Sequence, residues 1–214
     1  MPMPAIKICG INSAEALDAA LSARAEHFGL VFCAKSPRNV APDQAAALAA
    51  RAAGRARVVG LFVDPEPGEV EAVLAQVPLD VVQLHGKEAP ALCASIRSAT
   101  AREVWKAIGV RKREDLHAAR AYAGAADFAL YDAKPPEGAP LPGGTGLRID
   151  WTLLKGARHP LRWGLAGGLT PENVAEAAAI TGAALVDTSS GVESAPGVKD
   201  SAKIAAFCKS ARGE

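Results

Sequence analysis

A thiol and a carboxylate are the residues of this 214-residue sequence best suited to acid–base chemistry. Cys9 closes one short apolar run and Asp132 closes another, so each side chain emerges where a buried strand would end. A thiol with a lowered pKa serves as a base or nucleophile, and burial raises the pKa of a carboxyl until it serves as a general acid. The pair predicts proton transfer to and from a substrate held between them. A packed cysteine and a loop-capping aspartate are the structural alternatives.

Further polar and glycine-rich segments follow the other apolar runs. Arg38 could hold a carboxylate or phosphate through two parallel N–H groups, unless it is a solvated surface arginine. Glycine turns let backbone N–H groups approach a phosphate, and a following helix N-terminus adds a favourable dipole. The turns of this kind are Gly144 and Gly146, Gly167-Gly168, and Ser189-Ser190-Gly191. The other side chains expected to line the same mouth are Lys7, Gln83, His85 and Asp187.

The elements that must position these residues alternate regularly along the chain. Eight nearly continuous apolar runs, typical of parallel strands buried on both faces, alternate with Ala-rich segments of helical period. The predicted strands are Ala5–Cys9, Phe28–Phe32, Arg57–Val63, Val81–Leu84, Val104–Ile108, Phe128–Tyr131, Leu161–Leu165 and Ala184–Val186. The predicted helices are Ser13–Ala25, Pro42–Ala53, Glu69–Gln76, Ala89–Ser98, Lys112–Ala121, Pro171–Ile180 and Ser201–Ala211.

Helix start signals and the count of units decide the predicted fold. Ser13 and Thr170 are suitable N-caps, and Pro42 and Pro171 suit a first helical turn. Eight units of about 27 residues each predict an α/β fold, a single (β/α)8 TIM barrel over residues 1–214. The alternative is an open doubly wound sheet, which in its dinucleotide-binding form needs GxGxxG after the first strand. That turn reads CGINSAE.

Two long loops interrupt this rhythm. Ala133–Arg148 is rich in proline and glycine and follows the sixth predicted strand, and Ser189–Val198 follows the eighth. Loops of this length in a compact domain usually bind or cover a ligand. The first is predicted to close over the substrate; the alternative is that both are tolerated surface insertions.

Composition excludes several classes of partner. Lysine and arginine number 24 against 23 acidic residues, so no strong basic or acidic field favours nucleic acid or an anionic membrane. There is no apolar run long enough to span a bilayer and no secretory signal. Four widely spaced cysteines without a CxxC pair indicate reduced thiols in the cytoplasm. Of the four histidines only His85 reaches a strand end, without a second ligand nearby, so we expect no metal and no cofactor.

These segments together carry a family resemblance. From Lys7 to about Lys203 the chain contains, in order, KICGI, FCAKSPR, VGLFVD, VQLHG, LYDAK, GGTG with IDW, LAGGLTPENV, and VDTSSGVE with PGVKD. The ordered set closely resembles phosphoribosylanthranilate isomerase. The resemblance implies a (β/α)8 barrel that converts N-(5-phosphoribosyl)anthranilate to 1-(2-carboxyphenylamino)-1-deoxyribulose 5-phosphate in tryptophan biosynthesis. It also implies Cys9 as general base, Asp132 as general acid, Arg38 on the anthranilate carboxylate, and phosphate at the glycine turns.

The resemblance also leaves alternatives to be tested. Asn39 stands where many family members have tyrosine, and Cys9 stands where a related two-substrate isomerase would have aspartate. A metal-dependent pentose-phosphate epimerase would share the phosphate turns, and a non-catalytic phosphosugar-binding barrel would share the pocket. The partner expected is therefore a small phosphosugar–anthranilate molecule, bound by a monomer because no large apolar stripe is evident.

Overall fold

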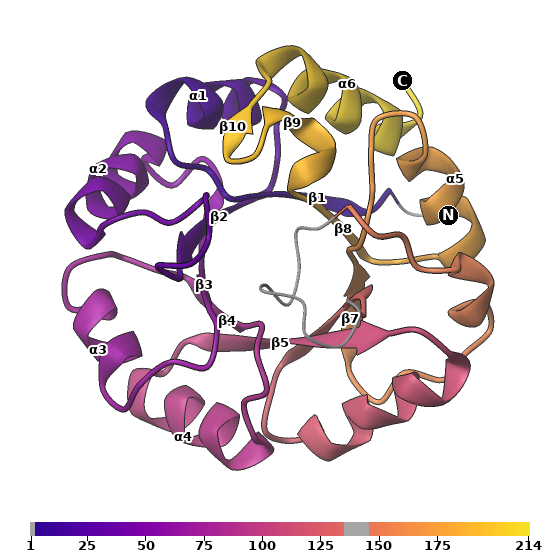
Figure 1. The fold of residues 1–214 in the computed structure, drawn as a ribbon, viewed down its shortest axis with the longest axis horizontal. Helices are drawn as coiled ribbons and strands as arrows, with labels where there is room; N and C mark the ends of the chain where they lie inside the picture. The colour runs from indigo at the N-terminus through magenta and orange to yellow at the C-terminus, as the bar shows by residue number, and fades with distance from the viewer. Residues whose placement is uncertain (1–2, 135–145) are drawn as a thin grey trace.

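Eight parallel strands close into a barrel in the order of the sequence (Figure 1). The computed structural model describes residues 3–134 and 146–214. The strands are β1 (Ala5–Cys9), β2 (His27–Phe32), β3 (Arg57–Phe62), β4 (Val81–Leu84), β5 (Glu103–Val110), β6 (Phe128–Ala133), β7 (Arg162–Leu165) and β8 (Leu185–Thr188). Because β1 pairs with β8 as well as with β2, the sheet has no edge. The predicted barrel is confirmed, and the open-sheet alternative is wrong.

Helices form a ring around the barrel (Figure 1). They are α1 (Ala14–Ser22), α2 (Pro42–Ala52), α3 (Glu69–Leu74), α4 (Pro90–Thr100), α5 (Val174–Thr181) and α6 (Ser201–Arg212), with 3₁₀ helices η1 (Arg113–Tyr122), η2 (Trp151–Leu153) and η3 (Ser190–Val192). Two predicted starts are correct: Ser13 accepts a hydrogen bond from the Ala16 N–H at 3.1 Å, and Pro42 opens α2. The Ser13 side chain pairs with a backbone N–H that the helix leaves unpaired, and Pro42 has no such N–H to leave unpaired.

The predicted start of the seventh-strand helix is wrong. Thr170 does not cap α5 and Pro171 is not in its first turn, since the helix begins at Val174 after Asn173. The side chain of Asn173 accepts from the Thr170 N–H at 2.9 Å and donates to the Gly168 carbonyl at 3.0 Å. These bonds hold residues 168–173 in a separate turn, so the helix starts later than the sequence indicates.

Three other segments differ from expectation. The predicted helix Lys112–Ala121 is the 3₁₀ helix η1, whose start is held by the Asp115 carboxylate on the N–H groups of Arg111 and Lys112. The described part of the β6–β7 connection contains only η2. The predicted loop Ser189–Val198 folds into η3 and a small antiparallel pair, β9 (Glu193–Ala195) and β10 (Val198–Lys199).

Most of the predicted lid Ala133–Arg148, including Gly144, lies outside the described residues.

Alternation along the strands decides which side chains face the barrel interior. Lys7 and Cys9 lie on the same face of β1, because residues two apart point the same way. Lys7 aligns with Asp187 of β8 and with His27 of β2. A Cβ on Gly29 of β2 would lie 2.9 Å from the Cys9 sulfur and 3.3 Å from the Lys7 nitrogen. The absence of a side chain at Gly29 therefore makes room for a charged layer above the apolar floor.

Candidate active site

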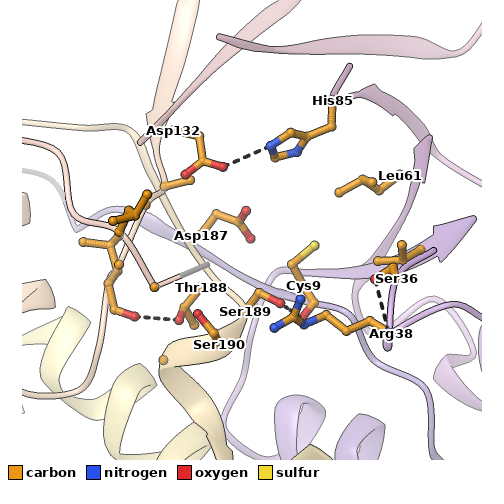
Figure 2. Close-up of a pocket in the computed structure, with 18 of the residues that line it drawn as sticks. Cys9, Ser36, Arg38, Leu61, His85, Asp132, Asp187, Thr188, Ser189 and Ser190 are labelled. Carbon is orange, nitrogen blue, oxygen red and sulfur yellow. Dashed lines mark hydrogen bonds and ion pairs between the residues drawn. The ribbon is translucent and has the colours of Figure 1, made fainter. Parts of the chain in front are cut away.

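A cavity of about 750 Å³, partly open to solvent, lies at the carboxyl ends of the strands (Figure 2). It collects residues that the sequence analysis selected separately, from the ends of six of the eight strands or the loops that follow them. Those lining it are Cys9, Arg38, His85, Asp132, Gly146, Gly167, Gly168, Asp187, Ser189, Ser190 and Gly191. Lys7 and Gln83 do not line the cavity; both are fully buried beneath it.

Cys9 lies in a buried layer with one cation and one further acid. The Lys7 ammonium contacts Asp187 at 3.0 Å, and neither side chain is appreciably exposed. Burial raises the pKa of Cys9, and Asp187 raises it further, while the nearby Lys7 lowers it without reversing the shift. Burial by itself lowers the pKa of Lys7, but the charges of Asp187 and Cys9 outweigh it and raise that pKa overall.

This environment corrects one expectation about Cys9. A base with a lowered pKa was predicted, but the pKa of the thiol is raised, chiefly by burial and further by Asp187, and the charge of Lys7 offsets this only in part. The pKa of Asp187 is likewise raised by burial, in spite of Lys7. The layer can hold one negative charge opposite Lys7 far more easily than two.

Asp132 lies within β6 and points into the cavity from the other side of the barrel. Its Oδ1 accepts from the N–H of Ala133 at 2.7 Å, and its Oδ2 lies 3.0 Å from Nε2 of His85 (Figure 2). The other ring nitrogen of His85, Nδ1, lies 3.1 Å from the side-chain nitrogen of Gln83. The predicted placement of the carboxylate, buried but reaching the cavity, is therefore seen in the structure.

Arg38 is held at the rim of the cavity by a buried carboxylate. Its Nε and Nη2 donate to the two oxygens of Glu193 at 2.7 and 2.8 Å. Lys199 donates to the same carboxylate at 2.7 Å. Burial alone would raise the pKa of Glu193, but Arg38 and Lys199 outweigh it and lower that pKa. Arg38 is only 6% exposed, so the solvated-arginine alternative is wrong.

The glycine turns after β7 and β8 form one wall of the cavity. Gly167 and Gly168 have φ angles of +85° and +64°, a left-handed conformation that side chains rarely adopt. The Thr188 hydroxyl donates to the Leu169 carbonyl at 2.8 Å, which joins the two loops. Ser189 and Ser190 add hydroxyls beside these backbone groups. The wall has the donors that a phosphate needs.

Sequence reasoning missed part of the site. Glu193 holds Arg38, and Lys199 contacts Glu193 in turn. The signal for them in the sequence is the acid that ends VDTSSGVE and the lysine of PGVKD, which follow the same strand. Cys33, which the sequence analysis did not select, also lines the cavity. An apolar side of the cavity was also missed, since isolated apolar residues carry no chemical signal. It consists of Val31, Leu61, Val63, Leu147 and Leu169.

The part of the chain that the structure describes has neither a cluster of metal-ligating side chains nor a helix that could span a membrane. Within residues 3–134 and 146–214, no three histidine, cysteine, aspartate or glutamate side chains gather as a metal site would require. No helix of that part of the chain is long and apolar enough to cross a membrane.

Comparisons with known proteins agree on one family. Residues 6–210 match the family model described as N-(5'-phosphoribosyl)anthranilate isomerase. An isomerase of that name from Paramagnetospirillum magneticum is 53% identical over 97% of both chains. The crystal structure of phosphoribosyl anthranilate isomerase from Thermotoga maritima superposes with a TM-score of 0.89 at 38% identity, covering 99% of this chain and 100% of that one. A second crystal structure of phosphoribosyl anthranilate isomerase, in complex with reduced 1-(o-carboxyphenylamino)-1-deoxyribulose 5-phosphate, gives a TM-score of 0.86 at 35% identity with the same coverage.

Proposed function

The chain belongs to the N-(5'-phosphoribosyl)anthranilate isomerase family, and we propose that Cys9 is the general base and Asp132 the general acid of its reaction. The enzyme converts N-(5-phosphoribosyl)anthranilate to 1-(2-carboxyphenylamino)-1-deoxyribulose 5-phosphate in tryptophan biosynthesis. The observation that carries the proposal is the cavity itself. Its lining brings the Cys9 thiol of β1 and the Asp132 carboxylate of β6 to one space, between a glycine-rich wall and Arg38.

The reaction proceeds in three steps in which the protons balance. Asp132 gives a proton to the furanose ring oxygen; the bond from C1 to that oxygen breaks, and the nitrogen lone pair forms a protonated Schiff base. The Cys9 thiolate then removes the proton from C2, and the electrons of the C=N bond return to nitrogen, giving an enolamine. Finally C1 takes a proton from the Cys9 thiol while the C2 hydroxyl returns one to Asp132. The ketone forms, and both side chains regain their initial states.

The two ends of the cavity match the two charged ends of the substrate. The Gly167-Gly168 and Ser189-Ser190-Gly191 turns would hold the phosphate with backbone N–H groups, and Gly146 would add to that wall. Arg38, fixed by Glu193, would meet the anthranilate carboxylate. The apolar side formed by Val31, Leu61 and Val63 suits the aromatic ring between them. Binding both ends orients C1 and C2 for proton transfer.

The catalytic roles are tested by turnover of freshly made phosphoribosylanthranilate, followed by loss of its fluorescence with EDTA present. Cys9→Ser and Asp132→Asn are each expected to lower kcat about 100- to 10,000-fold while the product analogue still binds. Cys93→Ser on α4 and Asp18→Asn on α1 make the same chemical changes outside the cavity and are expected to keep turnover. Near-normal kcat in either cavity variant would remove that residue from its role.

The organisation of the protein is part of the same proposal. Residues 1–214 form one catalytic domain, and the protein works as a cytoplasmic monomer without a cofactor. The large apolar side chains exposed in the described structure, Met3, Leu92, Leu147 and Val198, lie on separate elements and not in one stripe. Sedimentation equilibrium over a wide concentration range is expected to give the mass of one 21.9 kDa chain. A dimer mass at all concentrations would contradict this part of the proposal.

A further inference from the structure

Gln83 and His85 form a chain of contacts behind Asp132 that the three steps above do not use. Gln83, in β4, is fully buried, and His85 follows that strand with its side chain almost covered. One contact runs from the Gln83 amide to His85 Nδ1 at 3.1 Å. The second, from His85 Nε2 to Asp132 at 3.0 Å, is the dashed line between these two residues in Figure 2. A buried line of polar groups that ends on a catalytic carboxylate is placed to control that carboxylate.

The partners of the imidazole determine where its proton lies. The structure places the Gln83 side-chain nitrogen against Nδ1 and leaves Gln83 Oε1 without a partner among the described residues. In this orientation the amide N–H donates and Nδ1 accepts. A neutral imidazole that accepts at Nδ1 carries its hydrogen on Nε2. That N–H is directed at Oδ2 of Asp132. Gln83 therefore selects the tautomer in which His85 donates to the acid.

A buried ion pair between Lys106 and Glu88 fixes the backbone next to His85. The His85 N–H donates to the Phe62 carbonyl at 2.9 Å, which extends the β3–β4 pairing by one residue. The next residue, Gly86, donates its N–H to Glu88 and accepts from Lys106, each at 2.9 Å. Lys106 and Glu88 are themselves paired at 2.9 Å and buried. The imidazole is thus carried on a rigid turn rather than a loose loop.

We propose that His85, in the tautomer set by Gln83, is a positioning residue for Asp132. Its Nε2–H occupies the His85 side of Oδ2, while the Ala133 N–H occupies Oδ1. When Asp132 is protonated, its O–H has to point away from His85 and into the cavity, towards the substrate. When Asp132 has given up that proton, the two N–H groups stabilise the carboxylate that remains, with Asp187 and Lys7 the other charged groups facing the same space.

This inference rests on the proposed role of Asp132, but its first test does not require turnover. In wild-type protein labelled with ¹⁵N-histidine, the His85 resonances, assigned by comparison with His85→Gln, are expected to show hydrogen on Nε2. In Gln83→Leu, which keeps the side-chain size and removes the donor, the Nε2–H population is expected to fall. Hydrogen on Nδ1 in the wild-type protein would overturn the inference.

The kinetic test separates positioning of the acid from support of the fold. His85→Ala is expected to lower kcat about 10- to 100-fold with KM nearly unchanged, since the lost bond acts on a group whose charge develops during the reaction. His85→Gln, which restores an amide N–H, is expected to recover part of that loss, and Gln83→Leu to show a smaller decrease. His117→Ala removes an exposed histidine on η1 and serves as the control.

The outcomes can be told apart. Wild-type kcat in His85→Ala, or a rise in KM that accounts for the whole loss in kcat/KM, would overturn the inference. If His85→Ala does not fold, as judged by circular dichroism, Gln83→Leu and the wild-type tautomer still decide it. Absence of turnover in wild-type protein would instead overturn the proposed function, whatever the tautomer.

Discussion

At the scale of single residues, the charge available to Cys9 decides how it can act as a base. Lys7 lies within the barrel as one positive charge between two acidic groups, Asp187 and Cys9. In an interior from which water is excluded, a second anion beside one ammonium is costly. Cys9 therefore stays a thiol in the resting protein. It has to lose that proton before the C2 proton transfer, in which Cys9 acts as the thiolate.

The state of Cys9 can be measured directly. Burial raises the pKa of its thiol above the ordinary value of 9.0. A pH titration of thiolate absorbance, taken as the difference between wild-type protein and Cys9→Ser, is expected to show little Cys9 thiolate at neutral pH. The signal should rise only above about pH 9, because the thiol binds its proton more tightly in the folded protein. A thiolate already present at pH 7 would contradict this description of the layer.

The contact of Glu193 with Arg38 is expected to control substrate binding and stability, and not proton transfer. Glu193→Gln keeps the shape of the side chain but leaves Arg38 and Lys199 as neighbouring buried cations without a balancing charge. We expect KM to rise about 10-fold, because Arg38 loses its bidentate support, and stability to fall by about 3 kcal/mol.

Steady-state kinetics and chemical denaturation check both effects of Glu193→Gln. The control is Asp18→Asn, which breaks the exposed pair with Arg51 and is expected to leave stability nearly unchanged, because solvent screens that pair. Unchanged KM in a stable Glu193→Gln protein would show that Arg38 needs no such support.

At the scale of elements, the loops after β7 and β8 are packed together so closely that only glycine fits at their contact. A Cβ on Gly191 would overlap the Leu169 carbonyl oxygen and lie 2.9 Å from the Thr188 hydroxyl. Both neighbours belong to the wall that would hold the phosphate, and the carbonyl is backbone that cannot swing away. The turn in η3 and the turn after β7 are therefore in direct contact at Gly191, with no room for a side chain between them.

Gly191→Ala tests this dependence. We expect KM for the substrate to rise at least about 10-fold and inhibition by inorganic phosphate to weaken in parallel, since the two loops must separate to admit the methyl group. Gly54→Ala is the matched control. Gly54 lies in open space after α2 with a φ of +74°, so its substitution strains the backbone without touching the cavity. Equal effects of the two substitutions on KM would contradict the argument.

The elements also show where sequence patterns suffice. All eight strands were predictable, because a strand buried on both faces is a run of apolar residues that little else produces. Helix starts were predictable where the cap is local, as at Ser13. They were not predictable at Thr170, where Asn173 bonds back to Gly168 and forms an extra turn. Such a bond depends on the path of the loop, which the sequence pattern does not describe.

At the scale of the whole molecule, the two ends of the barrel have different roles. The amino-terminal end contributes stability, and the cavity at the carboxyl-terminal end contains the reactive groups. The amino-terminal end is filled with apolar side chains, among them Val59, Val81, Trp105 and Phe128. His27 lies against Trp105 there, with its Nδ1 unpartnered among the described residues. Burial lowers the pKa of His27 from 6.5 to about 4. This end of the barrel therefore tolerates the neutral imidazole but not the charged one.

The acid sensitivity of the fold follows from His27. Between pH 6.5 and 4 the unfolded chain takes up a proton at His27 that the folded protein does not, so the free energy of unfolding falls as the pH is lowered. The contribution is about 3 kcal/mol at most, fully lost near pH 4. Urea unfolding of wild-type protein and His27→Gln at pH 7.5 and pH 4.5 measures it. The variant is expected to lose less stability over this range; equal losses would assign the acid sensitivity to other groups.

The sequence by itself determined the fold and most members of the site. Strand periodicity predicts eight units, and in a parallel barrel every strand ends at the same face, so residues such as Cys9, Asp132 and Gly167 could be placed at one mouth before any coordinates. Only the tertiary structure decided how these groups act on each other. Residues distant in the chain interact in each case: they raise the pKa of Cys9, bind Arg38 through Glu193, and connect Gln83 to Asp132 through His85. Hydrogen bonds and charge interactions fall off over a few ångströms, and distances of that size are fixed by packing, which no local pattern of residues records.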